Sequence, residues 1–309
     1  MSEALLQLGP GALGNRDCID LHNSHISHRS LGRMITDVGS AHPDRAVTDH
    51  GGDGPPILLL HGLMGRGRTW RRQIGWLRRY GRVFTIDAAF HRGAGVDQVL
   101  APEDIATERF VADIAQALTL IDLGPAVLVG HSMGGLHAWC TAAQYPELVS
   151  AIVVEDMAPD FRGRTTGTWQ PWFASWPDRF DGLDAAIEMF GPIAGEYFYD
   201  AFDDGRLHGE LTVWADIADH WGGRDYWAQW RGVRVPALLI KASGGVTPAG
   251  QMREMLATNV FATLLEIESG HLVHDDAPGT FRGAVEAFLD GPVRMHAAGG
   301  GAGWRAGGR

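Results

Sequence analysis

VLVGHSMGGLHAW, residues 127–139, joins an apolar run to a helical pattern through a turn that holds two glycines and a serine. In the pattern G-x-S-x-G, here Gly130, Ser132 and Gly134, the serine occupies a strained strand-to-helix turn that leaves no room for larger neighbours. The first N–H groups of the helix that follows favour negative charge. The sequence therefore predicts Ser132 as a nucleophile and the Met133 backbone N–H as a donor to a developing oxyanion.

Apolar runs on both sides of this turn alternate with helical patterns. Strands are predicted at residues 55–62, 82–87, 126–130, 151–155, 236–242 and 262–268, with helices between them. The runs are continuously apolar, which is typical of a parallel sheet that helices cover on both faces. We therefore expect an α/β fold with a mostly parallel central sheet.

Composition divides the chain into a core, an insertion and two flanking segments. Residues 46–157 and 233–290 carry the strand and helix patterns of the core, and the aromatic-rich residues 158–232 between two late strands predict a helical cap over a binding site. Residues 1–45 are predicted to be an irregular extension, and 291–309 a disordered Gly-rich tail. His22, His25 and His28 lie three residues apart without a neighbouring Cys or carboxylate cluster, so we interpret them as solvated side chains instead of metal ligands.

Charge and cysteine content narrow the class of protein. The 309 residues carry a net charge of -11, which argues against nucleic-acid or anionic-membrane partners. Cys18 and Cys140 are the only cysteines, so no disulfide framework or zinc cluster is indicated. The first residues lack the basic and apolar regions of a signal peptide, and there is no run of about 18 apolar residues, so we expect neither a signal peptide nor a membrane span. We expect a cytoplasmic protein that acts on small molecules without a cofactor or metal.

Together these motifs resemble the α/β-hydrolase fold superfamily, over about residues 45–290. LLLHGLMG, residues 58–65, is similar to the family's His-Gly-x loop, and the resemblance implies that the N–H of Leu63 is the second oxyanion donor beside Met133. IESGHLVHDDAP, residues 267–278, is similar to the family's last histidine segment, which implies that His271 is the general base. His274 has no such match, and we interpret it as a helix-proximal or solvated histidine.

The third member of the expected triad is missing from its commonest place. The resemblance puts an aspartate in the loop after the penultimate strand, but IKASGGVTPAG has Gly244 or Gly245 there and no carboxylate between Lys241 and Gln251. Some members of the superfamily carry the acid one strand earlier, which is the end of IVVED. Spacing favours Asp156, and adjacent Glu155 is expected to point to the other face and to serve structure or solvation.

The resemblance implies a serine hydrolase with a helical cap that cleaves small or medium-sized, apolar or aromatic carboxylic esters, thioesters or lactones. Carbon–carbon bond hydrolysis of dienone acids stays open, as does a non-enzymatic small-molecule receptor. Residues 65–82 hold seven arginines and no acid, whereas residues 178–219 hold eleven acids and two arginines. We interpret these as two solvated or salt-bridged faces; alternatively, Arg66 or Arg68 binds an anionic group of the substrate. The sequence does not predict an oligomeric state.

Overall fold

The computed structural model describes residues 33–35, 46–91, 100–165, 169–200, 202–203 and 205–298. The histidines at positions 22, 25 and 28, and the tail from residue 299 onward, lie outside the described residues.

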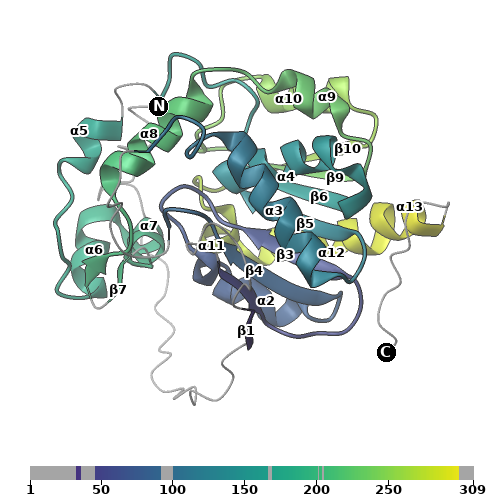
Figure 1. Cartoon of the computed structure of the whole chain (residues 1–309), viewed down its shortest axis with the longest axis horizontal. Coiled ribbons are helices and arrows are strands. Elements are labelled where there is room, and N and C mark those ends of the chain that lie inside the picture. The colour runs from purple at the N-terminus through teal and green to yellow at the C-terminus, as the bar shows by residue number, and fades with distance from the viewer. Residues whose placement is uncertain are drawn as a thin grey trace.

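One eight-stranded sheet organises the described chain (Figure 1). Its order is β1-β2-β4-β3-β5-β6-β9-β10; β2 runs antiparallel to β1 and β4, and all pairs from β4 to β10 are parallel. The strands are β1 (Arg33–Ile35), β2 (Ala46–Asp49), β3 (Pro56–Leu60), β4 (Arg82–Asp87), β5 (Ala126–His131), β6 (Val149–Glu155), β9 (Ala237–Ala242) and β10 (Ala262–Ile267). The predicted, mostly parallel α/β sheet is confirmed.

The alternation of side chains along each strand feeds two separate apolar cores. On β3, Leu58 and Leu60 pack with α3 (Thr107–Ile121), α4 (Met133–Gln144) and α10 (Gln251–Thr258). Ile57 and Leu59 of the same strand pack with α2 (Arg71–Leu77) and α12 (Pro278–Phe288) on the other face. Because both faces are covered, the strands can be apolar throughout, as the sequence indicated.

The segment predicted as a cap, residues 158–232, leaves the sheet after β6 and returns to it at β9. It contains α5 (Trp169–Phe173), α6 (Leu183–Phe190), α7 (Pro192–Tyr199), the hairpin β7 (Phe202–Asp203) and β8 (Arg206–Leu207), α8 (Leu211–Gly222) and α9 (Trp227–Gly232). Figure 1 shows α5 to α8 gathered at one side of the sheet. Its aromatic side chains pack on one another, with Trp176 in ring contact with Phe190, Phe198 and Phe202.

Two flanking segments differ from the expectation. The predicted irregular extension contains β1, whose backbone pairs with β2 through the register Arg33↔Asp49, a pairing that needs no particular side chains. The predicted disordered tail begins with a π-helical turn (Leu289–Val293) and α13 (Arg294–Ala298). Buried Leu289 and Val293 belong to the core beneath α12, and this burial anchors the turn despite Gly291 and Pro292.

Candidate active site

The predicted nucleophile lies on a strained turn between β5 and α4. Ser132 has φ 51° and ψ −122°, a conformation that side chains other than glycine rarely adopt. A Cβ on Gly130 would lie 2.2 Å from the Gly134 carbonyl oxygen, and one on Gly134 would lie 2.2 Å from the Leu60 oxygen. The turn therefore needs both glycines, and the Ser132 N–H is held by the carbonyl of Glu155 at 2.8 Å.

The two predicted oxyanion donors are the N–H groups of Met133 and Leu63. In each peptide unit, the carbonyl of the preceding residue is held by hydrogen bonds, which fixes the direction of the N–H. The Ser132 carbonyl accepts bonds from the N–H groups of Gly135 and Leu136, so the trans peptide points the Met133 N–H away from α4. The Gly62 carbonyl likewise accepts from Gly65 N and from a ring nitrogen of His61. Neither the Met133 N–H nor the Leu63 N–H has a hydrogen-bond partner within the described residues.

His61 fixes the loop of residues 61–65, which is predicted to supply an oxyanion donor and is called the oxyanion loop below. Its Nδ1 lies 2.8 Å from the Gly62 oxygen and its Nε2 lies 2.9 Å from the Ala88 N–H, so Nδ1 donates and Nε2 accepts. Burial lowers the pKa of His61, which agrees with a neutral ring of this tautomer. From the cap, the buried hydroxyl of Tyr197 lies 3.5 Å from the Leu63 carbonyl oxygen. The loop is thus fixed from both the core and the cap.

The predicted base and acid are hydrogen-bonded to each other. His271 Nδ1 donates to Asp156 Oδ2 at 2.7 Å, although 115 residues separate them. The Asp156 side chain is fully buried, and its carboxylate also accepts the N–H groups of Ala242 and Val246. His271 is 16% exposed, and its backbone carbonyl accepts a 3.1 Å bond from His131 Nε2, next to Ser132. Nothing in the described structure hydrogen-bonds the Ser132 hydroxyl to His271 Nε2.

The glycine loop that lacks the usual aspartate makes room for Asp156. A Cβ on Gly245 would lie 2.2 Å from Asp156 Oδ2 and 2.4 Å from Oδ1, whereas one on Gly244 would come only within 3.2 Å of the Ser269 oxygen. Asp156 itself has φ 43°, which turns its side chain toward this loop. The space where a later acid would stand is therefore filled by a carboxylate from β6.

Glu155 and His274 form a second buried acid–histidine pair. Both side chains are fully buried, and His274 Nδ1 lies 2.9 Å from each Glu155 carboxylate oxygen. Of the two expectations for His274, the solvated one is wrong and the helix-proximal one is confirmed, because the histidine lies on the short helix α11 (Val273–Asp276), stacked on Trp70 at 4.3 Å. As expected, Glu155 and Asp156 bind different groups: Glu155 binds His274, and Asp156 binds His271. Nothing in the sequence alone indicated this pair, because its partners are 119 residues apart.

The predicted arginine-rich and acidic segments meet as ion pairs. Arg66 lies 2.9 Å from Asp203 of the cap, and Arg68 lies 3.3 Å from both Asp200 and Asp203. Arg71 pairs with Glu196 at 2.7 Å. The interpretation as salt-bridged faces therefore describes these residues. A substrate anion that bound Arg66 or Arg68 would have to compete with the carboxylates of Asp200 and Asp203.

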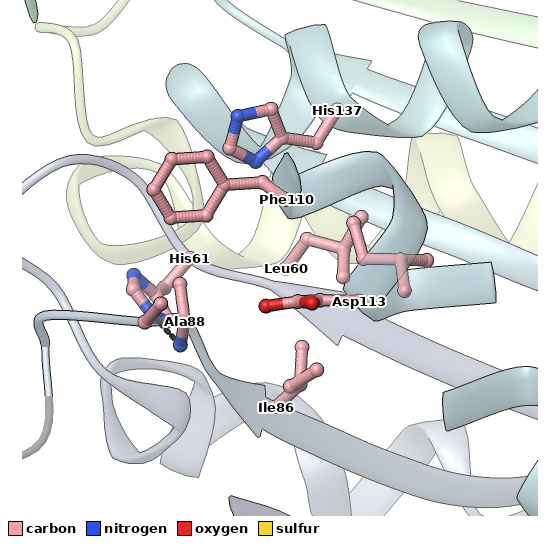
Figure 2. A pocket seen from close by; sticks show the side chains of 9 residues that line it. Leu60, His61, Ile86, Ala88, Phe110, Asp113 and His137 are labelled. Carbon is pink, nitrogen blue, oxygen red and sulfur yellow. Dashed lines mark hydrogen bonds between the residues drawn. The ribbon is translucent and has the colours of Figure 1, made fainter. Parts of the chain in front are cut away.

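A small cavity lies behind the oxyanion loop (Figure 2). Its volume is about 20 Å³, enough for about one water, and its lining includes His61, Asp113 and His137. His137 stacks on Phe110, its Nε2 has no hydrogen-bond partner among the described residues, and burial lowers its pKa to about 3. This cavity is too small for an ester substrate, and its histidine is too weakly basic for a general base near neutral pH.

Comparisons with known proteins agree with this fold. A family model described as alpha/beta hydrolase fold matches residues 55–190. The crystal structure of E-2-(acetamidomethylene)succinate hydrolase superposes with a TM-score of 0.70 at 19% identity, covering 80% of this chain and 95% of that one. The chain has the α/β-hydrolase fold.

Two curated proteins illustrate the range of sequences to which this chain is similar. The sn-1-specific diacylglycerol lipase ABHD11 of Danio rerio is 36% identical over 122 residues, which cover 39% of this chain and only 37% of the lipase. The (E)-2-((N-methylformamido)methylene)succinate hydrolase of Acinetobacter baylyi is 25% identical over 247 residues, covering 77% of this chain and 92% of that enzyme.

Two further features of the described residues concern membranes and metals. Within the described ranges, no helix is long and apolar enough to cross a bilayer. The same residues contain no group of three or more His, Cys, Asp or Glu side chains placed to hold a metal ion.

Proposed function

We propose that this protein is a serine hydrolase that cleaves a small or medium-sized carboxylic ester, thioester or lactone through an acyl-enzyme on Ser132. The observation that carries the proposal is the 2.7 Å hydrogen bond between His271 Nδ1 and Asp156 Oδ2, on a loop that His131 ties to the Ser132 turn. A carboxylate on Nδ1 is the arrangement that makes the opposite ring nitrogen basic and orients it.

In the proposed reaction, the Ser132 hydroxyl attacks the acyl carbon while His271 Nε2 takes its proton. Asp156 keeps the Nδ1 proton in place and stabilises the imidazolium that forms. The N–H groups of Leu63 and Met133 donate to the oxyanion, and the imidazolium returns its proton to the leaving alkoxide or thiolate. Water activated by His271 then hydrolyses the acyl-enzyme and frees Ser132.

The charges around the oxyanion loop favour an uncharged acyl group. Arg66 and Arg68, the cations that follow the loop, are bonded to Asp200 and Asp203 of the cap. An anionic substrate would have to displace these carboxylates, whereas an apolar or aromatic ester would not. A succinate derivative, such as the Acinetobacter relative's name gives for that enzyme, is therefore the less favoured substrate class.

The test is turnover of p-nitrophenyl butyrate by the wild type and by Ser132→Ala. We expect p-nitrophenolate release by the wild type, a butyryl adduct on Ser132 in the intact mass, and a loss of at least about 10³-fold in the variant. Equal turnover by Ser132→Ala would overturn the assignment. Saturable ligand binding without turnover of any ester would favour the receptor, and cleavage of dienone acids alone would favour the carbon–carbon hydrolase.

A matched ester of a dicarboxylic acid tests the charge argument. The Arg66→Ala variant frees Asp203 from one partner, and we expect turnover of p-nitrophenyl butyrate to stay within about threefold, because an exposed pair contributes little. A selective loss of activity on p-nitrophenyl hemisuccinate would instead assign Arg66 to the binding of substrate anions.

A further inference from the structure

Glu155 bonds to the backbone on both sides of the candidate site. Its own carbonyl oxygen accepts the Ser132 N–H at 2.8 Å. Its carboxylate oxygen Oε1 accepts the His274 backbone N–H at 2.9 Å, in addition to the His274 ring. One residue at the end of β6 therefore connects the serine turn to the loop that carries His271.

Apart from the bond of His271 Nδ1 to Asp156, the other restraints on the His271 loop reach elements away from the serine turn, such as the bond from Gly244 N to the Ser269 carbonyl. Helix α11 is a single turn of four residues, too short to be stable without tertiary contacts. Gly270 N donates to Asp276 Oδ2 across the loop, and the His274 carbonyl accepts from Gln73. The anchors that reach the serine turn are the Glu155–His274 bonds and the bond from His131 Nε2 to the His271 carbonyl.

We propose that Glu155, acting through His274, is a positioning residue that fixes His271 relative to Ser132; this inference rests on the proposed hydrolase function. Glu155 does not touch the substrate. Its effect is geometric: without it the His271 loop can shift relative to the serine turn, and a displacement near 1 Å in an active site costs on the order of 10²-fold in rate.

The pKa of His274 depends on Glu155 and on the other groups that face its ring. Burial by itself lowers the pKa of His274, but the carboxylates of Glu155 and, to a smaller extent, Asp275 together more than offset this, and the pKa is raised. Asp275 Oδ2 lies 3.6 Å from Nε2, and Arg72 of α2 pairs with Asp275. Trp70, Phe281 and the neutral His131 ring surround the imidazole, and Arg71 opposes its charge.

Three substitutions at position 155 separate geometry from charge. Glutamine keeps the length, so its oxygen can accept the His274 N–H while its amide donates to a neutral ring. Aspartate keeps the charge but is one methylene too short to reach both groups. Alanine removes every side-chain bond. If position is what matters, kcat on p-nitrophenyl butyrate should fall about 10- to 100-fold in Glu155→Ala and Glu155→Asp, with KM within about twofold, and Glu155→Gln should recover most of it.

Asp49→Asn is the matched control, because it breaks a buried carboxylate–Arg82 pair between β2 and β4 without contacting the candidate site. It should lower stability and leave kcat unchanged. Activity is expressed per folded molecule, counted by native-state tryptophan fluorescence. Recovery by Glu155→Asp together with loss in Glu155→Gln would overturn the inference, and so would kcat values that all match the wild type. If Glu155→Ala does not fold, the comparison of Asp with Gln still decides.

A proton NMR readout keeps this inference separate from the proposed function. The Nδ1 proton of His271, shared with Asp156, should give a downfield resonance in the wild type, in Asp49→Asn and in Glu155→Gln, and it should shift or broaden in Glu155→Asp. An unchanged resonance in Glu155→Asp would overturn the positioning role even if the protein hydrolysed no ester. Failure of the wild type to turn over esters, with the resonance behaving as expected, would count against the proposed hydrolase alone.

Discussion

Two acid–histidine pairs lie side by side in this molecule and differ in what surrounds them. Glu155, the last residue of β6, and Asp156, which follows it, bind histidines that are three residues apart, His274 and His271. The His274 side chain is fully buried and stacked on Trp70, whereas the His271 side chain is 16% exposed. A carboxylate on Nδ1 thus occurs in both pairs, and the accessible second nitrogen distinguishes the candidate catalytic one.

The carboxylates also differ in how they are satisfied. Asp156 accepts two backbone N–H groups from the β9 loop besides the His271 ring, at Ala242 and Val246. Glu155 has only the backbone N–H of His274 besides the His274 ring. Asp156 can therefore lose its histidine and remain hydrogen-bonded, whereas among the described residues the Glu155 carboxylate depends on His274 for every hydrogen bond. The first pair should matter chiefly for rate and the second chiefly for stability and position.

The largest expected effect separates the two acids by activity. Asp156→Asn should lower kcat on p-nitrophenyl butyrate by about 10⁴-fold, since an amide cannot hold the Nδ1–H tautomer or stabilise the imidazolium. Glu155→Gln should lose less than about tenfold. Steady-state kinetics of both variants, each at saturating substrate, measures the contrast. Equal and mild losses would remove Asp156 from the proposed triad.

The second contrast compares the two histidines by their effect on the free energy of unfolding. His274→Ala leaves the buried Glu155 charge without its counterion, which typically costs about 3–5 kcal/mol. His271→Ala should cost about 1–2 kcal/mol, because Asp156 keeps two backbone donors. Urea unfolding followed by tryptophan fluorescence gives both values. Kinetics on the same samples should rank them in the opposite order, and a matching order would contradict the division of roles.

A third substitution acts on Asp156 through the glycine loop. In Gly245→Ala the new Cβ would overlap the Asp156 carboxylate at 2.2 Å, so we expect the carboxylate to move and kcat to fall about 10- to 100-fold. Gly244→Ala is the matched control, with its nearest contact at 3.2 Å from the Ser269 oxygen. If both alanines behave alike, Gly245 is not what gives Asp156 its place.

These contrasts also separate what the sequence could predict from what it could not. The strands, the Ser132 turn and the His271 segment were predictable because each depends on residues within about ten positions of one another. Asp156 was predicted from the resemblance, because some members of the superfamily carry the acid one strand earlier and the glycines of the later loop leave its commonest place vacant.

The Glu155–His274 pair was beyond such reasoning for a physical reason. Whether a histidine beside a helix is solvated or buried depends on which side chains of distant strands reach it, and its partner lies 119 residues away. The same applies to Trp70, which covers the ring from a third element. Patterns among neighbouring residues do not predict these contacts. The short strand β1 and helix α13 were missed similarly, since backbone pairing and the burial of Val293 decide them.

The smallest expected effect concerns how each histidine makes stability depend on pH. The pKa of His274 is raised by Glu155 despite burial, so its contribution is fully present below about pH 6.5 and is lost as the pH rises through the raised value. The neutral, buried rings of His61, His91, His131 and His137 act oppositely: burial lowers their pKa values, and their contribution is lost as the pH falls below about 6.5.

Glu155→Gln should convert His274 from the first group to the second, because burial then acts on the ring without the carboxylate that opposes it. The stability deficit of the variant relative to the wild type should be largest near pH 6 and shrink toward pH 9, by at most about 1.4 kcal/mol per pH unit. Urea unfolding at several pH values measures the deficit. Asp49→Asn should give a deficit that is flat over this range, because the pKa of Asp49, lowered mainly by its hydrogen bond to Arg82, lies far below it. A flat deficit in Glu155→Gln as well would mean that the His274 ring is neutral in the wild type, and the two histidine pairs would then differ only in exposure.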